Sequence, residues 1–385
     1  MTKRWLPLLT ALAILVAPVP AAFADGHPGK TDVFAGEEAF SHAAAEGVRY
    51  DPRLGGFRLR DEADSGYRRS GYFLIDHLRY SAGFDTAVAS WNADCPVGTW
   101  VKAELSASHD DGKTWSAWYE MASWGDPSVI KRQPKTGKVK ADEVGRVNED
   151  TLQLKRPATR LRYRLWLQTE RPDATPLVTL AAVSVVDAAK TLPPDDTPGR
   201  AWGKEVPAQF RSQSQLPSDI SWRGCGPTSL TMALTAHGIA LPTESVAHAC
   251  WDELNGLYGN WPFLAAAGSQ LMRQAGETIK VSAGRKKVFR SYVSWAPDWK
   301  EVEDEVLAGR PVLVSIYFGE GELKGSMTEA SDGHLILVRG FTKDGHPICL
   351  DPAARNEAKG RVIYDRRELH RARHGGPIIV FRPVE

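Results

Sequence analysis

The chain has little cysteine and no excess of either charge. Four cysteines in 385 residues are too few for a disulfide-stapled scaffold. Lys plus Arg number 48 against 47 Asp plus Glu, so no overall field favours nucleic acid or an anionic membrane as a partner. With 42% hydrophobic and 25% charged residues, the composition excludes fibrous and disordered classes. The length predicts about two domains.

Long apolar runs are missing beyond the N-terminus. Lys3 and Arg4 precede an apolar run over residues 5–16, and Ala22-Phe-Ala24 has the form of a signal-peptidase site. This layout predicts a signal peptide over residues 1–24 and an exported bacterial protein, located in the periplasm or outside the cell. No later run reaches the roughly 20 apolar residues of a membrane span, so we expect no stable membrane insertion. An uncleaved N-terminal anchor is the alternative.

Residues 30–188 have the pattern of a β domain. From Trp100 to Ser108 polar and apolar residues alternate, as they do on a half-buried antiparallel strand. A hairpin signal follows at residues 110–113, and residues 160–167 alternate in the same way. Short strands separated by turn signals predict a β-sandwich-like accessory domain.

Three of the thirteen tryptophans lie close together in this region, at Trp115, Trp118 and Trp124. One interpretation places them in the core of the small sandwich. The other is an aromatic platform for sugars, which would give the N-terminal domain a weak contact with the cell wall or with glycans.

A stretch rich in proline and aspartate divides the chain. Residues 191–199 read Thr-Leu-Pro-Pro-Asp-Asp-Thr-Pro-Gly, which builds no packed element, so we expect a semi-rigid linker over residues 189–205. In residues 206–385, helical periods at 230–237, 243–254 and 299–307 are followed by strand-like runs at 311–318, 334–341, 347–350 and 378–381. Helices followed by strands predict an α+β domain.

Cys225 is the first candidate for a reactive side chain. It lies in Trp222-Arg-Gly-Cys-Gly-Pro-Thr-Ser-Leu230, where a loop enters a helix and Pro227 suits the first turn. The partial positive charge of a helix N-terminus favours a thiolate, and the free N–H groups there can donate to an oxyanion. A buried structural thiol is the alternative.

Two later segments supply partners for this thiol. His334 stands at the start of an apolar strand, where a general base would lie, and Asp351 ends a neighbouring strand. A Cys–His pair needs a third group that fixes the imidazole, and a carboxylate does so. The alternative for Asp351 is that it only initiates the turn at Pro352.

On these motifs, residues 206–385 resemble the peptidase C39-like family, a group of cysteine peptidases with a papain fold. The matching segments are Ser212-Gln213, Cys225-Gly-Pro-Thr-Ser, Gly259-Asn-Trp-Pro-Phe, Gly309-Arg-Pro-Val-Leu-Val-Ser, Gly333-His-Leu-Ile-Leu-Val-Arg-Gly and Asp351-Pro-Ala. The resemblance implies Cys225 as nucleophile, His334 as base and Asp351 as orienting carboxylate. It also implies an upstream glutamine in the oxyanion hole, for which Gln213 fits best and Gln215 is the second choice.

The chain departs from the family's exporter members, which carry membrane and ATPase domains. It has no later membrane run and no G-x-x-x-x-G-K-[ST] loop, and it is more similar to the secreted, stand-alone branch with a β-rich N-terminal domain. The expected function is an exported cysteine hydrolase that cleaves amide bonds of a peptide or protein through a thioester acyl-enzyme. The alternatives are a cell-wall peptide amidase or an acyl-transferase with the same triad, and a catalytically inactive binding protein.

No cofactor and no metal site are expected, because His346, His370 and His374 lack the spacing of metal ligands. Cys250 lies on an apolar helical face, which predicts a core position. Cys349 precedes the candidate carboxylate by two residues and is expected either near the site or in a disulfide with Cys250, formed in an oxidising compartment. The sequence leaves this pairing open.

Overall fold

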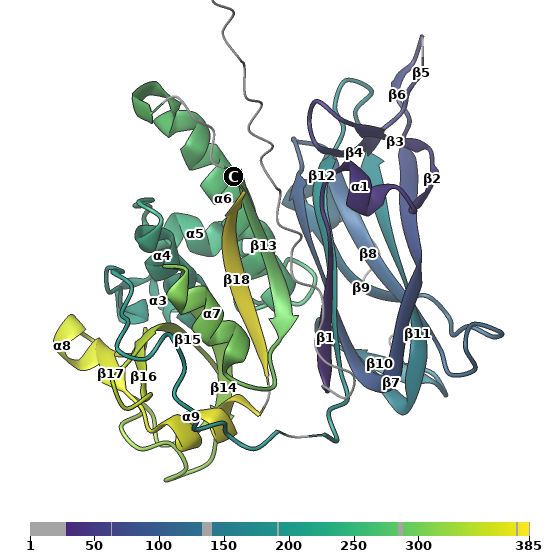
Figure 1. The fold of residues 1–385 in the computed structure, drawn as a ribbon. Coiled ribbons are helices and arrows are strands. Elements are labelled where there is room, and N and C mark those ends of the chain that lie inside the picture. Colours follow the sequence, from purple (N-terminus) through teal and green to yellow (C-terminus); the bar gives the residue numbers. More distant parts are fainter. Residues whose placement is uncertain are drawn as a thin grey trace, which may run out of the picture.

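The computed structural model of the chain describes residues 28–62, 64–132, 141–190, 192–283, 288–374 and 376–384. Within these ranges two large sheets lie side by side, one from the N-terminal half and one from the C-terminal half (Figure 1). The predicted signal peptide, residues 1–24, lies outside the described residues. None of the described helices is both long and apolar enough to cross a membrane.

The N-terminal sheet has ten strands, all paired antiparallel. They are β1 (Gly29–Phe34), β2 (Ala44–Glu46), β3 (Val48–Asp51), β4 (Gly56–Leu59), β7 (Ser70–Asp94), β8 (Thr99–Ser108), β9 (Tyr119–Gly125), β10 (Gly145–Asn148), β11 (Thr151–Thr169) and β12 (Leu177–Val186). The order is β3-β4-β12-β7-β11-β8-β9, with β1 on β12, β2 on β7 and β10 on β11. The described residues of this half also contain a hairpin of β5 (Asp61–Glu62) and β6 (Gly66–Tyr67) and two short helices, α1 (Glu37–Phe40) and α2 (Pro127–Ile130).

Two long strands organise this sheet. β7 has 25 residues and β11 has 19, and their pairing is interrupted by three breaks in register. Such irregularities bend and twist strands, so that one sheet can enclose a core. Side chains from both strands, among them Phe73, Trp91 and Leu165, are buried in that core. The β-rich character and the strand at residues 100–108 are therefore confirmed, and the strands form one hydrogen-bonded sheet.

The three clustered tryptophans have different surroundings. Trp124 is 6% exposed and belongs to the core, as the first interpretation predicts. Trp115 and Trp118 are half-buried, and each has a guanidinium over its ring, Arg162 and Arg164 respectively, at 4.0 Å from the ring centroid. Because a cation already covers one face of each ring, the structure does not support an open sugar platform here.

The C-terminal sheet has six strands, all antiparallel to their neighbours, in the order β13-β18-β14-β15-β16-β17. They are β13 (Val288–Trp295), β14 (Val312–Phe318), β15 (Ser331–Phe341), β16 (Pro347–Leu350), β17 (Arg361–Ile363) and β18 (Pro377–Val384). Its helices are α3 (Ser218–Ser221), α4 (Cys225–Ala236), α5 (Thr243–Ala249), α6 (Trp261–Ala283), α7 (Lys300–Leu307), α8 (Glu357–Gly360) and α9 (Arg366–Arg373), with a 3-10 turn at Gln213–Gln215. Helices α4, α5 and α6 cover one face of this sheet and α7 and α9 the other.

The predicted helices at 230–237 and 299–307 and the four predicted strands are present. The helix predicted at 243–254 needs correction, because it begins at Thr243 but ends at Ala249. Helix α6 and strand β13 escaped prediction. In helix α6, Phe263 packs into one core and Leu264 into another, so apolar residues lie on more than one side of the helix. Its sequence therefore lacks the 3.6-residue apolar period by which a surface helix, with one buried side, is recognised.

Buried polar contacts join the two sheets. Asn92 on β7 exchanges two hydrogen bonds with the backbone of Ser291 on β13: its Nδ2 donates to the carbonyl at 2.6 Å and its Oδ1 accepts the N–H at 3.0 Å. The hydroxyl of Ser184 on β12 accepts the Trp295 N–H at 2.6 Å. Satisfied polar pairs in a buried contact fix one arrangement, because any other would leave them unpaired.

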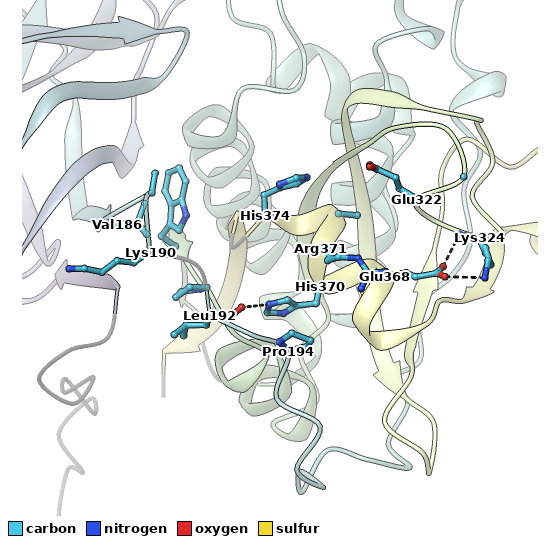
Figure 2. A pocket seen from close by; sticks show the side chains of 15 residues that line it. Val186, Lys190, Leu192, Pro194, Glu322, Lys324, Glu368, His370, Arg371 and His374 are labelled. Carbon is cyan, nitrogen blue, oxygen red and sulfur yellow. Dashed lines mark hydrogen bonds and ion pairs between the residues drawn. The ribbon is translucent and has the colours of Figure 1, made fainter.

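Part of the segment predicted as a linker, residues 192–195, is held against α9. The Nε2 atom of His370 donates to the Leu192 carbonyl and the Nε atom of Arg366 donates to the Asp195 carbonyl, both at 2.8 Å. Figure 2 shows Leu192 and Pro194 beside a cavity, with His370 and Arg371 of α9 on another side. The cavity has a volume of about 530 Å³, and Trp295 at the end of β13 also lines it. None of the predicted site residues lines this cavity.

Candidate active site

Cys225 is the first residue of α4, as its motif predicts. The N-cap is Gly224, which offers no side chain to the helix, so the first N–H groups of α4 are not taken up by a side-chain cap. The Cys225 side chain is partly buried. A thiol at this place has the favourable end of the helix dipole next to it.

The residue after Cys225 is closely packed. A Cβ added to Gly226 would lie 3.1 Å from Leu335 Cδ1 and 3.2 Å from both Gly259 Cα and Leu264 Cδ1. These distances are shorter than ordinary carbon contacts, so a larger residue would push α4 away from β15 and α6. The Cys-Gly pair is therefore a packing requirement as well as a motif.

His334 lies on β15, opposite Ile316 of β14. The next residue on β15, Leu335, accepts a hydrogen bond at its carbonyl from the Ser229 hydroxyl of α4, at 2.9 Å. This bond ties the helix that begins at Cys225 to the strand that carries His334. The His334 side chain is 12% exposed, and its Nε2 atom lies 2.8 Å from Oδ1 of Asp351.

Asp351 follows β16 and is 1% exposed. Besides the imidazole, its Oδ1 atom accepts the Ala353 N–H at 2.9 Å, and its Oδ2 atom accepts the Tyr364 hydroxyl at 3.0 Å. The carboxylate therefore contacts the histidine, which the simple turn interpretation does not require. Tyr364, itself fully buried, is a site residue that sequence reasoning missed, and neither a motif nor a spacing signals it.

The thiol and the imidazole form a hydrogen-bonded pair. Since Nε2 of His334 is bonded to Asp351, Nδ1 is the atom left for the thiol. Burial would raise the pKa of Cys225, but the hydrogen bond and charge of His334, together with bonds from the backbone at Leu335 and Gly226, lower it below its usual value. Burial would lower the pKa of His334, but Asp351 and Cys225 raise it to about 10. A thiolate–imidazolium pair is therefore favoured at neutral pH.

The carboxylate stays ionised in this arrangement. Burial would raise the pKa of Asp351, but the bond to His334, the imidazolium charge, the Ala353 N–H and the Tyr364 hydroxyl together hold it below its usual value. A buried negative charge next to the imidazole is what keeps His334 protonated.

Of the two glutamines, the geometry favours Gln213. Its Nε2 atom donates to the Ser221 carbonyl at 2.9 Å, which leaves a second N–H on that nitrogen. Its Cβ lies 3.6 Å from the point where a Cβ of Gly224 would stand, so this side chain is beside the residue that precedes Cys225. Gln215, the second choice, is exposed.

All four cysteines of the chain are free. Cys250 is buried beside α5 in the core under α4, as predicted, while Cys349 is buried on the opposite face of the sheet. The alternative of a disulfide between them is therefore wrong. Burial raises the pKa of both of these thiols. At Cys225 the neighbouring groups outweigh burial, and the pKa is lowered. Within the described ranges, no three His, Cys, Asp or Glu side chains gather as a metal site would require.

Both halves of the chain match known families. Residues 22–186 match the family described as Peptidase C39 N-terminal domain, and residues 205–373 match the Peptidase_C39 like family. The resemblance read from the motifs is thereby confirmed. Among curated proteins, none matches this chain.

Two solved structures share a limited likeness with the chain. A double glycine motif protease from an AMS/PCAT transporter, in complex with the leader peptide, is 18% identical, with 47% of this chain and 95% of that one covered and a TM-score of 0.28. A GH29 fucosidase of Ruminococcus gnavus, in complex with fucose, is 13% identical, with 38% of this chain and 25% of that one covered and a TM-score of 0.20. At such TM-scores neither likeness bears on function.

Proposed function

We propose that this chain, which joins a peptidase C39-like domain to a peptidase C39 N-terminal domain, is a cysteine hydrolase that cleaves peptide bonds. Cys225 is the nucleophile, His334 the general acid and base, and Asp351 the carboxylate that orients the imidazole. The observation that carries the proposal is the continuous series of hydrogen bonds from the thiol through the imidazole to a buried carboxylate. As part of this proposal, residues 206–385 have a papain-like fold and residues 30–188 a sandwich-like fold.

The reaction follows from these positions. The Cys225 thiolate attacks the carbonyl carbon of the scissile bond, and the free N–H groups at the start of α4 with the second N–H of Gln213 stabilise the oxyanion. The imidazolium of His334 gives its proton to the leaving amine as the C–N bond breaks, which leaves a thioester. His334 then takes a proton from water, the hydroxide attacks the thioester, and the acid and the thiolate are released.

Two other outcomes share this first half-reaction. An acyl-transferase would pass the thioester to an amine instead of water, and a cell-wall amidase would differ only in substrate. Products formed with and without an added amine separate transfer from hydrolysis. A catalytically inactive binding protein is less well supported, because such a protein has no need of a thiol whose pKa is lowered by its neighbours. Export to the periplasm or the medium is proposed on the sequence of residues 1–24 alone.

The state of the thiol gives a first prediction. Because the pKa of Cys225 is lowered, iodoacetamide should alkylate it at a pH at which the other three cysteines, whose pKa values burial raises, do not react. His334→Ala should move the midpoint of this reaction upward, since the imidazolium charge is lost. Mass spectrometry of peptides after timed labelling measures both. A Cys225 that titrates near the ordinary thiol value of about 8.5 would contradict the pairing.

The oxyanion hole gives a second prediction. Gln213→Ala should lower kcat about a hundredfold with little change in KM, because the donor acts on the transition state. Gln215→Ala is the matched control, since this exposed neighbour should leave kcat unchanged. Equal losses in the two variants would show that the turn, rather than the Gln213 amide, matters.

A further inference from the structure

The first turn of α6 lies between the two sheets. Phe263 packs into the core of the N-terminal sheet, with its ring centroid 6.2 Å from that of Trp91. The next residue, Leu264, packs into the core of the C-terminal sheet. Both side chains are almost fully buried, at 2% and 0% exposed. The position of this turn is therefore set from both halves of the chain.

The N-terminal half holds this turn through a carboxylate. Asp150 lies in the turn between β10 and β11, next to Glu149, which has a positive φ of 54°. Its Oδ2 atom accepts the N–H of Trp261, the first residue of α6, at 2.9 Å, and its Oδ1 atom accepts the Thr151 hydroxyl at 3.0 Å. The first N–H groups of a helix have no partner inside it, and negative charge is favoured there.

The other side of the same segment touches the nucleophile's neighbour. Gly259 Cα and Leu264 Cδ1 both lie 3.2 Å from where a Cβ of Gly226 would stand. The backbone of Gly226 is in turn one of the hydrogen-bonding groups around the Cys225 thiol. A displacement of the start of α6 would therefore move a group that stabilises the thiolate.

We propose that Asp150 is a positioning residue for the peptidase site, which fixes the start of α6 so that Gly259 and Leu264 hold Gly226 beside the thiolate. This inference rests on the proposed function. It makes the N-terminal sheet a working part of the catalytic unit, in place of the accessory role expected from the sequence.

Asp150 carries its charge at a cost to stability. Burial raises its pKa to about 7, although the Trp261 N–H and the Thr151 hydroxyl lower it, and the charge of Glu149 raises it further. Residues 261–264 on the facing turn of α6 bear no charge. The folded chain thus binds this proton more tightly than the unfolded chain, so stability falls as the pH rises from 3.8 to about 7. An amide oxygen would accept the same N–H without this cost.

The test compares Asp150→Ala and Asp150→Asn in the full chain. In Asp150→Ala, the pH midpoint of Cys225 alkylation should rise by about half a unit or more, and kcat should fall about tenfold with KM nearly constant. Asp150→Asn should match the wild type at pH 6, where the native carboxyl is largely protonated. At pH 8 the kcat of Asp150→Asn should be about threefold lower than that of the wild type, because a charged acceptor makes the stronger hydrogen bond. At the same pH its thermal midpoint should be higher than that of the wild type, because no charge is buried.

The matched control is Asp110→Ala. Asp110 accepts the N–H and the hydroxyl of Thr114 in a hairpin of the same sheet, and its loss should leave the alkylation midpoint and kcat unchanged. A wild-type alkylation midpoint in Asp150→Ala would overturn the proposal. If that variant does not fold, equal pH profiles of Asp150→Asn and wild type would overturn it instead. Alkylation is measured without substrate. A wild type that cleaves no peptide would refute the proposed function, whereas the alkylation midpoints would still decide whether Asp150 positions the thiol.

Discussion

Replacing Cys225 by serine is expected to abolish peptide hydrolysis, with a loss in kcat of about four orders of magnitude or more. A hydroxyl is a nucleophile only when a base removes its proton. In the native chain Asp351 and the Cys225 thiolate, acting against the effect of burial, raise the pKa of His334 to about 10, so that thiolate and imidazolium stand as an ion pair; a serine hydroxyl is far less acidic than a thiol and forms no such pair. The site is built to keep a thiolate that already exists, not to generate an alkoxide.

The measurement is cleavage of a mixed peptide library, followed by mass spectrometry, with purified wild type and variant at equal concentration. Thermal unfolding should be nearly unchanged, because serine differs little in volume and Cys225 is only partly buried. Cys95→Ser serves as the matched control: this partly buried thiol lies in the N-terminal half, with a long contact to the Trp124 carbonyl at 3.8 Å, and should be dispensable for cleavage. Cleavage that survives in Cys225→Ser would end the cysteine-hydrolase proposal.

The elements that carry the candidate triad were predictable because each has a local signal. Cys225 begins a helix with proline two residues later. His334 directly precedes the apolar run of β15, although the strand itself begins three residues earlier at Ser331, and Asp351 directly follows β16. Such features depend on a few neighbouring residues. Their mutual distances were not predictable from periodicity, and the family resemblance supplied the expectation that they meet.

What the sequence did not reveal depends on contacts between distant segments. Tyr364 reaches Asp351 only because β17 pairs with β16 and returns the chain beneath the carboxylate. Asp150 meets Trp261 across 111 positions. The proline-rich linker looks open by composition, yet its carbonyls are bonded by His370 and Arg366. No local pattern encodes such pairings, since each partner alone reads as an ordinary polar or aromatic residue.

The orienting carboxylate should give the second largest effect. Asp351→Ala is expected to lower kcat about a thousandfold, because the imidazole loses the group that fixes its ring and keeps it charged. It also leaves the Nε2–H of His334 and the Tyr364 hydroxyl without their acceptor in a buried place, which should lower the free energy of unfolding by about 3 kcal/mol. The pKa of Asp351 is lowered from 3.8 and that of His334 is raised from 6.5 to about 10, so this loss of stability should be greatest between pH 3.8 and pH 6.5, where both groups are also charged in the unfolded chain. It should shrink at lower pH, as Asp351 becomes protonated in the folded chain, and shrink steadily as the pH rises from 6.5 to about 10.

Asp351→Asn should be much milder, with a loss of about tenfold or less in kcat. The amide oxygen of the new side chain can take the place of Oδ1 and accept hydrogen bonds from His334 and Ala353. Its NH₂ group can donate to the Tyr364 hydroxyl, which then accepts a hydrogen bond instead of donating one.

Adding Tyr364→Phe tests this reversal of the hydrogen bond. The Tyr364→Phe change should cost little by itself, about twofold in kcat, but it should cost clearly more when combined with Asp351→Asn, where the amide NH₂ would then be buried without a partner. Steady-state rates of the four chains in this double-mutant cycle give the coupling, and a strictly additive result would show that Tyr364 does not hold the carboxylate. Wild-type rates for Asp351→Ala would reduce the candidate triad to a dyad, with Asp351 serving only the turn at Pro352.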